Sequence, residues 1–324
     1  MFTAVRTWLR APAAASAAAL ALLGAACGSA PGGPTDPTTT GLALQHLVAT
    51  RDYLPGLAAD LYLPDLVRVA PVVVMVPGGA WVAADRSGLG PLAERLAADG
   101  IVVVNATHRP ARDGVRFPEP LQDVLCSVGF AVRQAVTAGI EPGPVVVLGH
   151  SSGAHLAALA ALAPDRFRGA CPYPDMLGDA LVGLGGVYDV SELAEVAEPL
   201  FGVGPEDDPT AWRDGNPMTW VRQRPSLPVF LGYGDADPLA PAPFTRAFAG
   251  ALQAGGHPVH VEVVAGADHP GMYDSAYVAE ALRAWIAALP APTTRAGSDT
   301  GASVRVSDSV PPTLSHLPRR HGAG

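Results

Sequence analysis

The sequence predicts an α/β fold, doubly wound, in which one mostly parallel sheet has helices on both faces. Continuous runs of valine and leucine at residues 72–76 and 145–148 are typical of strands that are buried on both sides in a parallel sheet. Segments with apolar residues at helical spacing lie between such runs. Strands and helices alternate in this way over roughly 230 residues, which favours a single domain.

The expected elements follow in order along the chain. Residues 57–63 alternate apolar and polar side chains and predict an early antiparallel strand. Further strands are expected at 72–76, 101–105, 145–148, 181–187, 229–233 and 259–264, and helices at 91–98, 120–138, 244–252 and 275–289. Between residues 191 and 228 the periodicity fails in a segment that is too long for an ordinary connection. We interpret 191–228 as a small cap or lid over the active site, with a surface excursion unrelated to substrate as the alternative.

The segment after residues 145–148 carries the main functional motif. It reads Gly-His-Ser-Ser-Gly from Gly149 to Gly153 and leads into a segment rich in alanine and leucine. A G-x-S-x-G motif between a strand and a helix is typical of a nucleophile elbow, a tight turn that exposes a serine Oγ. The glycines allow the adjoining backbones to approach closely because they carry no Cβ. The motif therefore predicts Ser151 as a nucleophile.

A serine nucleophile needs a base, and the base needs a carboxylate that orients it. In nucleophile-elbow enzymes these partners follow in the order Ser, Asp, His, in loops after later strands. The loop after residues 229–233 offers Asp235 and Asp237. We prefer Asp237, because it fits a Gly-x-x-Asp pattern common in these enzymes, and Asp235 would then cap the turn. Asp189, which also follows an expected strand, is a rival.

The candidate base must come after these aspartates. His257 precedes the last expected strand and His260 lies within it, whereas His269 lies in the loop beyond. We therefore predict His269 as the base. His150 and His155 flank the nucleophile, and we interpret them as packed or hydrogen-bonded histidines.

The loop after residues 72–76 reads Pro-Gly-Gly-Ala-Trp from Pro77 to Trp81. It resembles the His-Gly-Gly-x-Trp turn of the carboxylesterase, lipase and arylformamidase branches of the α/β-hydrolase superfamily. The resemblance covers roughly residues 60–289 and implies the α/β-hydrolase fold. Pro77 departs from the histidine of the family, which removes a side-chain anchor for this loop.

Carried over by position, the resemblance implies that Gly79 and Ala80 supply backbone N–H groups to an oxyanion hole. The residue after the nucleophile, Ser152, supplies another. Alanine at the last position is expected to cost little if its φ is negative. Trp81, Trp212 and Trp220 are candidates for lining an acyl or alcohol pocket, with plain packing as the alternative.

Composition excludes several classes of function. The chain has 21 basic and 30 acidic residues, a formal net charge of −9, and no lysine. Without lysine, a P-loop, a Schiff-base lysine or a Ser-Lys dyad is impossible. The negative charge argues against nucleic-acid binding, which draws most of its affinity from basic surfaces. The sequence has no cysteine or histidine cluster of metal-binding type, and no metal or cofactor is expected.

The N-terminal segment predicts export. Residues 1–26 have two arginines, then an uncharged Ala/Leu stretch, then small residues, which is the layout of a signal peptide. The residues before Cys27 resemble the lipobox of bacterial lipoproteins, which implies that Cys27 is lipidated and anchors the chain to the outer face of the membrane. Plain secretion is the alternative. Residues 27–41 predict a flexible tether, 42–289 the α/β-hydrolase domain, and 290–324 a disordered tail.

Two further cysteines, Cys126 and Cys171, predict a disulfide, since export leads to an oxidising compartment. Two separate buried thiols are the alternative.

Together these features predict an exported serine hydrolase that cleaves small-molecule carboxylic esters through an acyl-enzyme, with any membrane contact made by the lipid anchor alone. Amide or formamide hydrolysis with the same three residues is one alternative. A catalytically silent binding module on the same fold is another. The acyl chain length, the alcohol and the oligomeric state do not follow from the sequence.

Overall fold

The computed structural model of the chain describes residues 47–291. The predictions for the signal peptide, Cys27, the tether, residues 42–46 and all but the first two residues of the tail lie outside these described residues. Within them, no helix is long and apolar enough to span a membrane.

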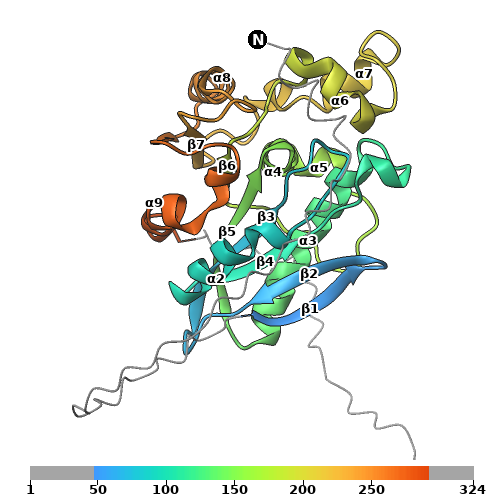
Figure 1. Cartoon of the computed structure of the whole chain (residues 1–324). Helices are drawn as coiled ribbons and strands as arrows, with labels where there is room; N and C mark the ends of the chain where they lie inside the picture. The colour runs from blue at the N-terminus through green and yellow to red at the C-terminus, as the bar shows by residue number, and fades with distance from the viewer. Residues whose placement is uncertain (1–46, 292–324) are drawn as a thin grey trace, which may run out of the picture. The chain divides into compact units, whose positions relative to one another are not determined.

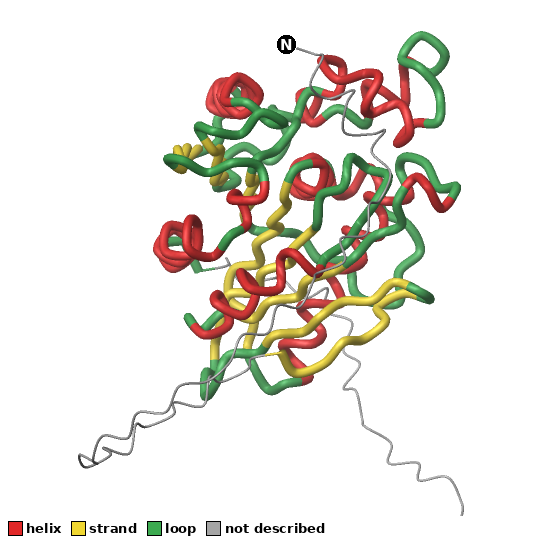
Figure 2. The backbone as a smooth tube through the Cα atoms, in the orientation of Figure 1, coloured by secondary structure: helices red, strands yellow, loops and turns green. Residues whose placement is uncertain are grey.

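The described part contains one eight-stranded sheet in the order β1-β2-β4-β3-β5-β6-β7-β8. Its strands are drawn in yellow in Figure 2. β1 and β2 pair antiparallel, as do β2 and β4, and every other neighbouring pair is parallel. The strands are β1 (Leu47–Leu54), β2 (Leu57–Tyr62), β3 (Val69–Val76), β4 (Val102–Ala106), β5 (Glu141–His150), β6 (Ala180–Leu184), β7 (Val229–Gly234) and β8 (Val259–Val264). The predicted doubly wound, mostly parallel sheet is confirmed.

Helices cover both faces of the sheet (Figure 1). α2 and α9 pack on one face, and α3, α4 and α8 pack on the other. The helices are α2 (Gly90–Ala98), α3 (Glu119–Thr137), α4 (Ser152–Leu162), α5 (Pro164–Phe167), α6 (Ala194–Phe201), α7 (Pro209–Asp214), α8 (Ala242–Ala254) and α9 (Ser275–Ala287).

The alternation of side chains along the strands explains this layering. On β3, Val72, Val74 and Val76 belong to the core under α3 and α4, whereas Val73 and Met75 belong to the core under α2 and α9. All five side chains are at most 1% exposed. A continuous apolar run is therefore required, because successive side chains enter opposite cores.

The differences from the sequence-based expectation include an additional strand and the end of β6. β1 was not predicted, and it forms the edge of the sheet beside β2. β6 ends at Leu184 rather than at residue 187, because Gly185 adopts a φ of +52° and turns the chain away from the sheet.

The segment 191–228 contains α6 and α7 rather than continuous strands or long helices. α6 ends at Gly202, whose φ of +79° is typical of a helix C-terminus. Asp208 caps α7 by accepting a hydrogen bond from the N–H of Ala211 at 2.9 Å. Its role as a lid stays a prediction.

A disulfide joins Cys126, on α3, to Cys171, in the loop between α5 and β6. Cys126 is buried and Cys171 is partly exposed. The bond ties this loop to the helical layer that covers the central strands.

Candidate active site

The residues predicted to act together come from neighbouring strands of the sheet. Ser151 directly follows β5, Asp237 follows β7, and His269 follows β8. These strands are parallel, so the loops after them meet at one edge of the sheet.

The backbone at Ser151 has the geometry of a tight strand-to-helix turn. Its φ is +54° and its ψ is −126°, a region that residues with a Cβ rarely occupy. A Cβ added at Gly149 would lie 2.2 Å from the carbonyl oxygen of Gly153, and one at Gly153 would lie 2.3 Å from the carbonyl oxygen of Val76. Both glycines of the motif are therefore required by close backbone contacts.

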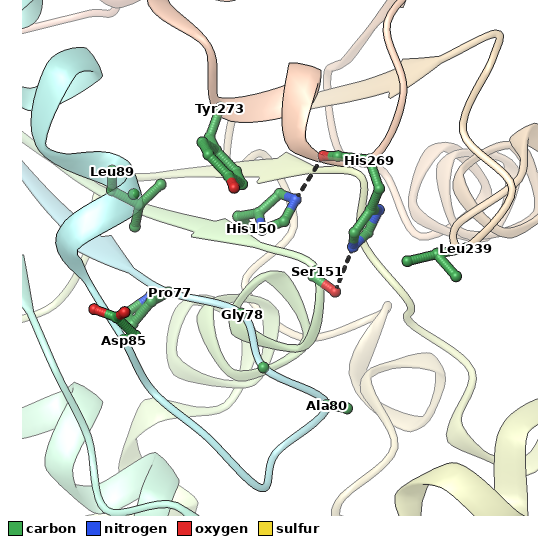
Figure 3. Close-up of a pocket in the computed structure, with 12 residues that line it drawn as sticks. Pro77, Gly78, Ala80, Asp85, Leu89, His150, Ser151, Leu239, His269 and Tyr273 are labelled. Atoms are coloured by element: carbon green, nitrogen blue, oxygen red, sulfur yellow. Dashed lines mark hydrogen bonds between the residues drawn. The ribbon is translucent and has the colours of Figure 1, made fainter. Parts of the chain in front are cut away.

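A chain of hydrogen bonds links Ser151, His269 and Asp237. Ser151 Oγ and His269 Nε2 are 2.9 Å apart, and His269 Nδ1 and Asp237 Oδ2 are 2.7 Å apart. The carboxylate is acceptor-only, so Nδ1 carries the proton and Nε2 accepts from the serine hydroxyl. Figure 3 shows the imidazole of His269 pointing toward Ser151. This arrangement can take a proton from Ser151 Oγ.

Asp237 is fixed by its own turn. Its Oδ1 accepts hydrogen bonds from the N–H groups of Leu239 at 2.8 Å and Ala240 at 2.9 Å. Burial raises the pKa of Asp237, but the hydrogen bonds from His269 and these two N–H groups outweigh it and hold the pKa below its usual value. The carboxylate is therefore ionised where it meets the imidazole.

The rival aspartates have other partners. Asp235 accepts a hydrogen bond from the N–H of Gly266 at 2.6 Å and so stabilises a turn. Asp189 accepts hydrogen bonds from Ser191 and from Asn216 Nδ2. Neither bonds to His269.

The rival histidines are also engaged elsewhere. The ring nitrogens of His257 lie 3.2 Å and 3.0 Å from the carbonyl oxygens of Leu227 and Val221. His260 lies on the edge strand β8, with Nε2 3.1 Å from a carboxylate oxygen of Glu262.

The turn after β3, residues 77–81, lies beside Ser151, and we call it the glycine turn. A Cβ at Gly78 would lie only 2.7 Å from the Cβ of Ser151. Among the described residues, the N–H groups of Gly79 and Ala80 donate to no protein acceptor. Ser152 is the first residue of α4, where an N–H has no partner within the helix. These three donors are available to a ligand.

The condition under which alanine at position 80 would cost little is not met. Ala80 has a φ of +50° rather than a negative φ, and Gly79 and Trp81 have φ values of +140° and +60°. Alanine and tryptophan therefore occupy left-handed conformations that cost free energy, and the surroundings must hold them there.

Trp81 supplies the anchor that Pro77 cannot. Its backbone N–H donates to Ser152 Oγ at 3.3 Å, and its indole Nε1–H donates to His155 Nδ1 at 3.2 Å. His155 Nε2–H in turn donates to the carbonyl oxygen of Gly215 at 2.7 Å. Burial lowers the pKa of His155 to about 4, which keeps the imidazole neutral and able to accept from Trp81.

His150 packs against the base. Its Nε2 lies 3.0 Å from the carbonyl oxygen of His269, and its ring contacts both His269 and Tyr273 (Figure 3). Burial, and then the nearby His269, lower the pKa of His150 to about 3. The neutral imidazole donates Nε2–H to that carbonyl and holds the backbone of the base. The interpretation of His150 and His155 as packed, hydrogen-bonded histidines agrees with these contacts.

A cavity of about 360 Å³ opens onto Ser151 and His269. Sequence reasoning missed several of the residues that line it: Asp85, Gly88, Leu89, Leu239 and Tyr273. They lie in loops and short helices whose spatial position no local pattern predicts.

The three tryptophans do not line this cavity. Trp81 is 2% exposed and bonded to His155. Trp212 stacks on Phe201, and Trp220 donates to the carbonyl oxygen of Asp214 at 2.9 Å. No residue of 191–228 lines it either. Within residues 47–291, no three His, Cys, Asp or Glu side chains are grouped as metal ligands would be.

Comparison with known proteins places the chain in a family. Residues 59–252, more than half of the chain, match the BD-FAE family. The chain belongs to the BD-FAE family. The matched region includes Ser151 and Asp237 and ends before His269. The resemblance to α/β-hydrolases is thereby confirmed.

Curated relatives of this BD-FAE chain include two proteins of Mycobacterium tuberculosis (strain ATCC 25618 / H37Rv). LipM, a probable carboxylic ester hydrolase, is 29% identical over 261 residues, which cover 75% of this chain and 59% of LipM. Esterase LipC is 32% identical over 200 residues, which cover 58% of this chain and 49% of LipC. The matched region thus spans about half to three-fifths of the length of these relatives.

Solved structures share the fold. A truncated carbohydrate esterase from gut microbiota superposes with a TM-score of 0.66 at 21% identity, covering 76% of this chain and 98% of that one. The propionate-bound esterase Est2 of Thermogutta terrifontis gives a TM-score of 0.58 at 22% identity, covering 76% and 93%.

Proposed function

We propose that this BD-FAE chain is a serine carboxylesterase that hydrolyses small-molecule esters through an acyl-enzyme. The hydrogen-bonded chain from Ser151 through His269 to Asp237 is the observation that carries the proposal. The esterase names of relatives LipM and LipC support the reaction class.

In the first half of the reaction, Ser151 Oγ attacks the ester carbonyl carbon as His269 Nε2 takes its proton. Asp237 holds the imidazole in the tautomer with Nδ1–H and stabilises the imidazolium that forms. The carbonyl oxygen becomes an oxyanion, which accepts hydrogen bonds from the N–H groups of Ser152, Gly79 and Ala80. His269 then gives its proton to the leaving alcohol oxygen as the C–O bond breaks.

In the second half, a water molecule attacks the acyl group on Ser151. His269 Nε2 accepts a proton from that water and returns it to Ser151 Oγ when the acid leaves. No other group is needed for proton balance.

The test is hydrolysis of 4-nitrophenyl esters from acetate to palmitate by the full chain and by Ser151→Ala. We expect hydrolysis by the wild-type protein and, in the variant, a kcat lower by on the order of 10³-fold or more. The chain-length optimum would then define the acyl group. Equal rates for the two proteins would overturn the proposal.

A further inference from the structure

The cavity contains a carboxylate for which the proposed reaction has no use. Asp85 lines the same cavity as Ser151 and His269, and its side chain is exposed to solvent. In Figure 3, Asp85 and Leu239 lie on opposite sides of Ser151. The Asp85 Oδ1 accepts a hydrogen bond from the N–H of Ser87 at 2.9 Å, which fixes its orientation.

Asp85 carries a full negative charge at neutral pH. Hydrogen bonds from the backbone and side chain of Ser87 lower the pKa of Asp85 below its usual value. The adjacent cation, Arg86, makes its ion pair with Asp60, whose two carboxylate oxygens it binds at 2.8 Å and 2.9 Å, so at Asp85 it acts only as a nearby charge.

No other lining residue balances this charge. The remaining titratable side chains of the cavity wall are His150, His269 and Tyr273, and no arginine lines it. His150 is neutral, since burial keeps its imidazole unprotonated. One end of the cavity therefore presents a fixed negative charge, and the other presents the apolar side chain of Leu239.

We propose that Asp85 selects ester substrates by charge, favouring those with a cationic group at its end of the cavity and disfavouring anionic ones. This rests on the proposed esterase function. With the dielectric constant of water, an exposed carboxylate changes the binding constant of a group of unit charge about 6 Å away by roughly threefold. The binding constant rises for a cation and falls for an anion. Salt should screen that factor.

The experiment compares kcat/KM of the full-length wild type and Asp85→Asn on two matched sets of three esters. In one set the charge is on the alcohol: 3-acetoxy-N,N,N-trimethylanilinium, neutral 3-tert-butylphenyl acetate and anionic 3-acetoxybenzoate. In the other it is on the acyl chain: 4-nitrophenyl esters of 4-(trimethylammonio)butyrate, 5,5-dimethylhexanoate and glutarate. Dividing variant by wild type for each ester cancels the intrinsic reactivity of that ester.

Asparagine retains the side-chain oxygen that accepts from Ser87, so the local turn is preserved. Asp52→Asn is the matched control, because Asp52 is exposed on β1, outside the cavity, and its loss changes the net charge equally. In at least one set, Asp85→Asn should lower kcat/KM for the cation about threefold and raise it for the anion about threefold, each relative to the neutral ester of that set. Both effects should shrink at high salt, and Asp52→Asn should produce neither.

Equal changes for all three esters in each set would mean a structural effect, and no change in either set would mean no charge selection. Either result overturns the role of Asp85 while leaving the esterase function intact. A wild type that hydrolyses the 4-nitrophenyl acetate-to-palmitate series but none of these six esters would also overturn the role of Asp85. A wild type that hydrolyses neither group of esters would remove the proposed function, and this inference with it.

Discussion

Trp81 donates its indole N–H to Nδ1 of His155 at 3.2 Å, which joins the glycine turn to the helix that follows the nucleophile. Both side chains are buried. The bond matters because Ala80 and Trp81 occupy left-handed backbone conformations that local preference does not favour. The contact with α4 therefore positions the N–H groups that the proposed reaction uses.

Trp81→Phe tests this positioning. Phenylalanine keeps an aromatic ring in the site but cannot donate to His155, so the glycine turn should lose its orientation. We expect kcat on a 4-nitrophenyl ester to fall about tenfold with little change in KM, because the oxyanion forms only in the transition state. Steady-state kinetics would show this split. A proportionate rise in KM at constant kcat would indicate a substrate contact instead.

Asp237→Asn should lower kcat by on the order of 10³-fold, since an amide cannot stabilise the imidazolium and favours the wrong tautomer. Asp235→Asn is the matched control, because Asp235 lies in the same turn and bonds to Gly266 rather than to His269. Steady-state kinetics of both variants separates the effect of the Asp237 carboxylate from an effect of the turn. A comparable loss of kcat in both variants would mean that the structure of the turn, and not the carboxylate of Asp237, determines the rate.

Ser151, Asp237 and His269 could be predicted from the sequence because each follows a segment with a recognisable local pattern. The elbow needs Gly149 and Gly153 because a Cβ at either position would lie only 2.2–2.3 Å from a backbone carbonyl oxygen, so the fold requires a motif that the sequence shows. Asp237 and His269 follow apolar runs that predict β7 and β8. Because these strands are parallel, the loops after them lie at the same edge of the sheet. The expected order Ser, Asp, His along the chain then reduced the number of candidate aspartates and histidines.

Other features of the structure have no local sequence pattern that would predict them. β1 has charged residues at Arg51 and Asp52, so its apolar alternation is weak, and it forms a strand because β2 offers an edge. The bond of Trp81 to His155 spans 74 positions of sequence. Ala80 has a positive φ, which alanine as a residue type does not predict.

The stability of the fold should depend on pH through His155. Burial lowers its pKa from 6.5 to about 4, so the unfolded chain protonates first as the pH falls. Between about pH 6.5 and pH 4 the unfolded state binds more protons, and the free energy of unfolding falls with falling pH. For this group the loss from about pH 7 to pH 5 should be about 2 kcal/mol.

Urea unfolding of the wild type and of His155→Gln at these two pH values measures the difference. Glutamine can accept from Trp81 and donate to Gly215 but does not titrate. The variant should therefore lose less stability on acidification than the wild type. The same loss in both proteins would exclude His155 as the source.

Removing the disulfide should destabilise the chain. The bond between Cys126 and Cys171 closes a loop with a sequence separation of 45. Replacing both cysteines by alanine should lower the free energy of unfolding by about 3 to 4 kcal/mol, because the unfolded chain gains conformational freedom. Urea unfolding without reductant measures this, and reduced wild-type protein should approach the variant. Activity should persist, since neither cysteine lines the cavity.

Covalent trapping tests most directly whether Ser151 is the nucleophile. The full chain, Ser151→Ala and Ser152→Ala would each be treated with paraoxon, followed by intact-mass measurement and peptide mapping. We predict one diethylphosphoryl group on Ser151 in the wild type, the same modification in Ser152→Ala, and none in Ser151→Ala. Modification of Ser151→Ala to the wild-type extent, or a label mapped to another residue, would contradict the account.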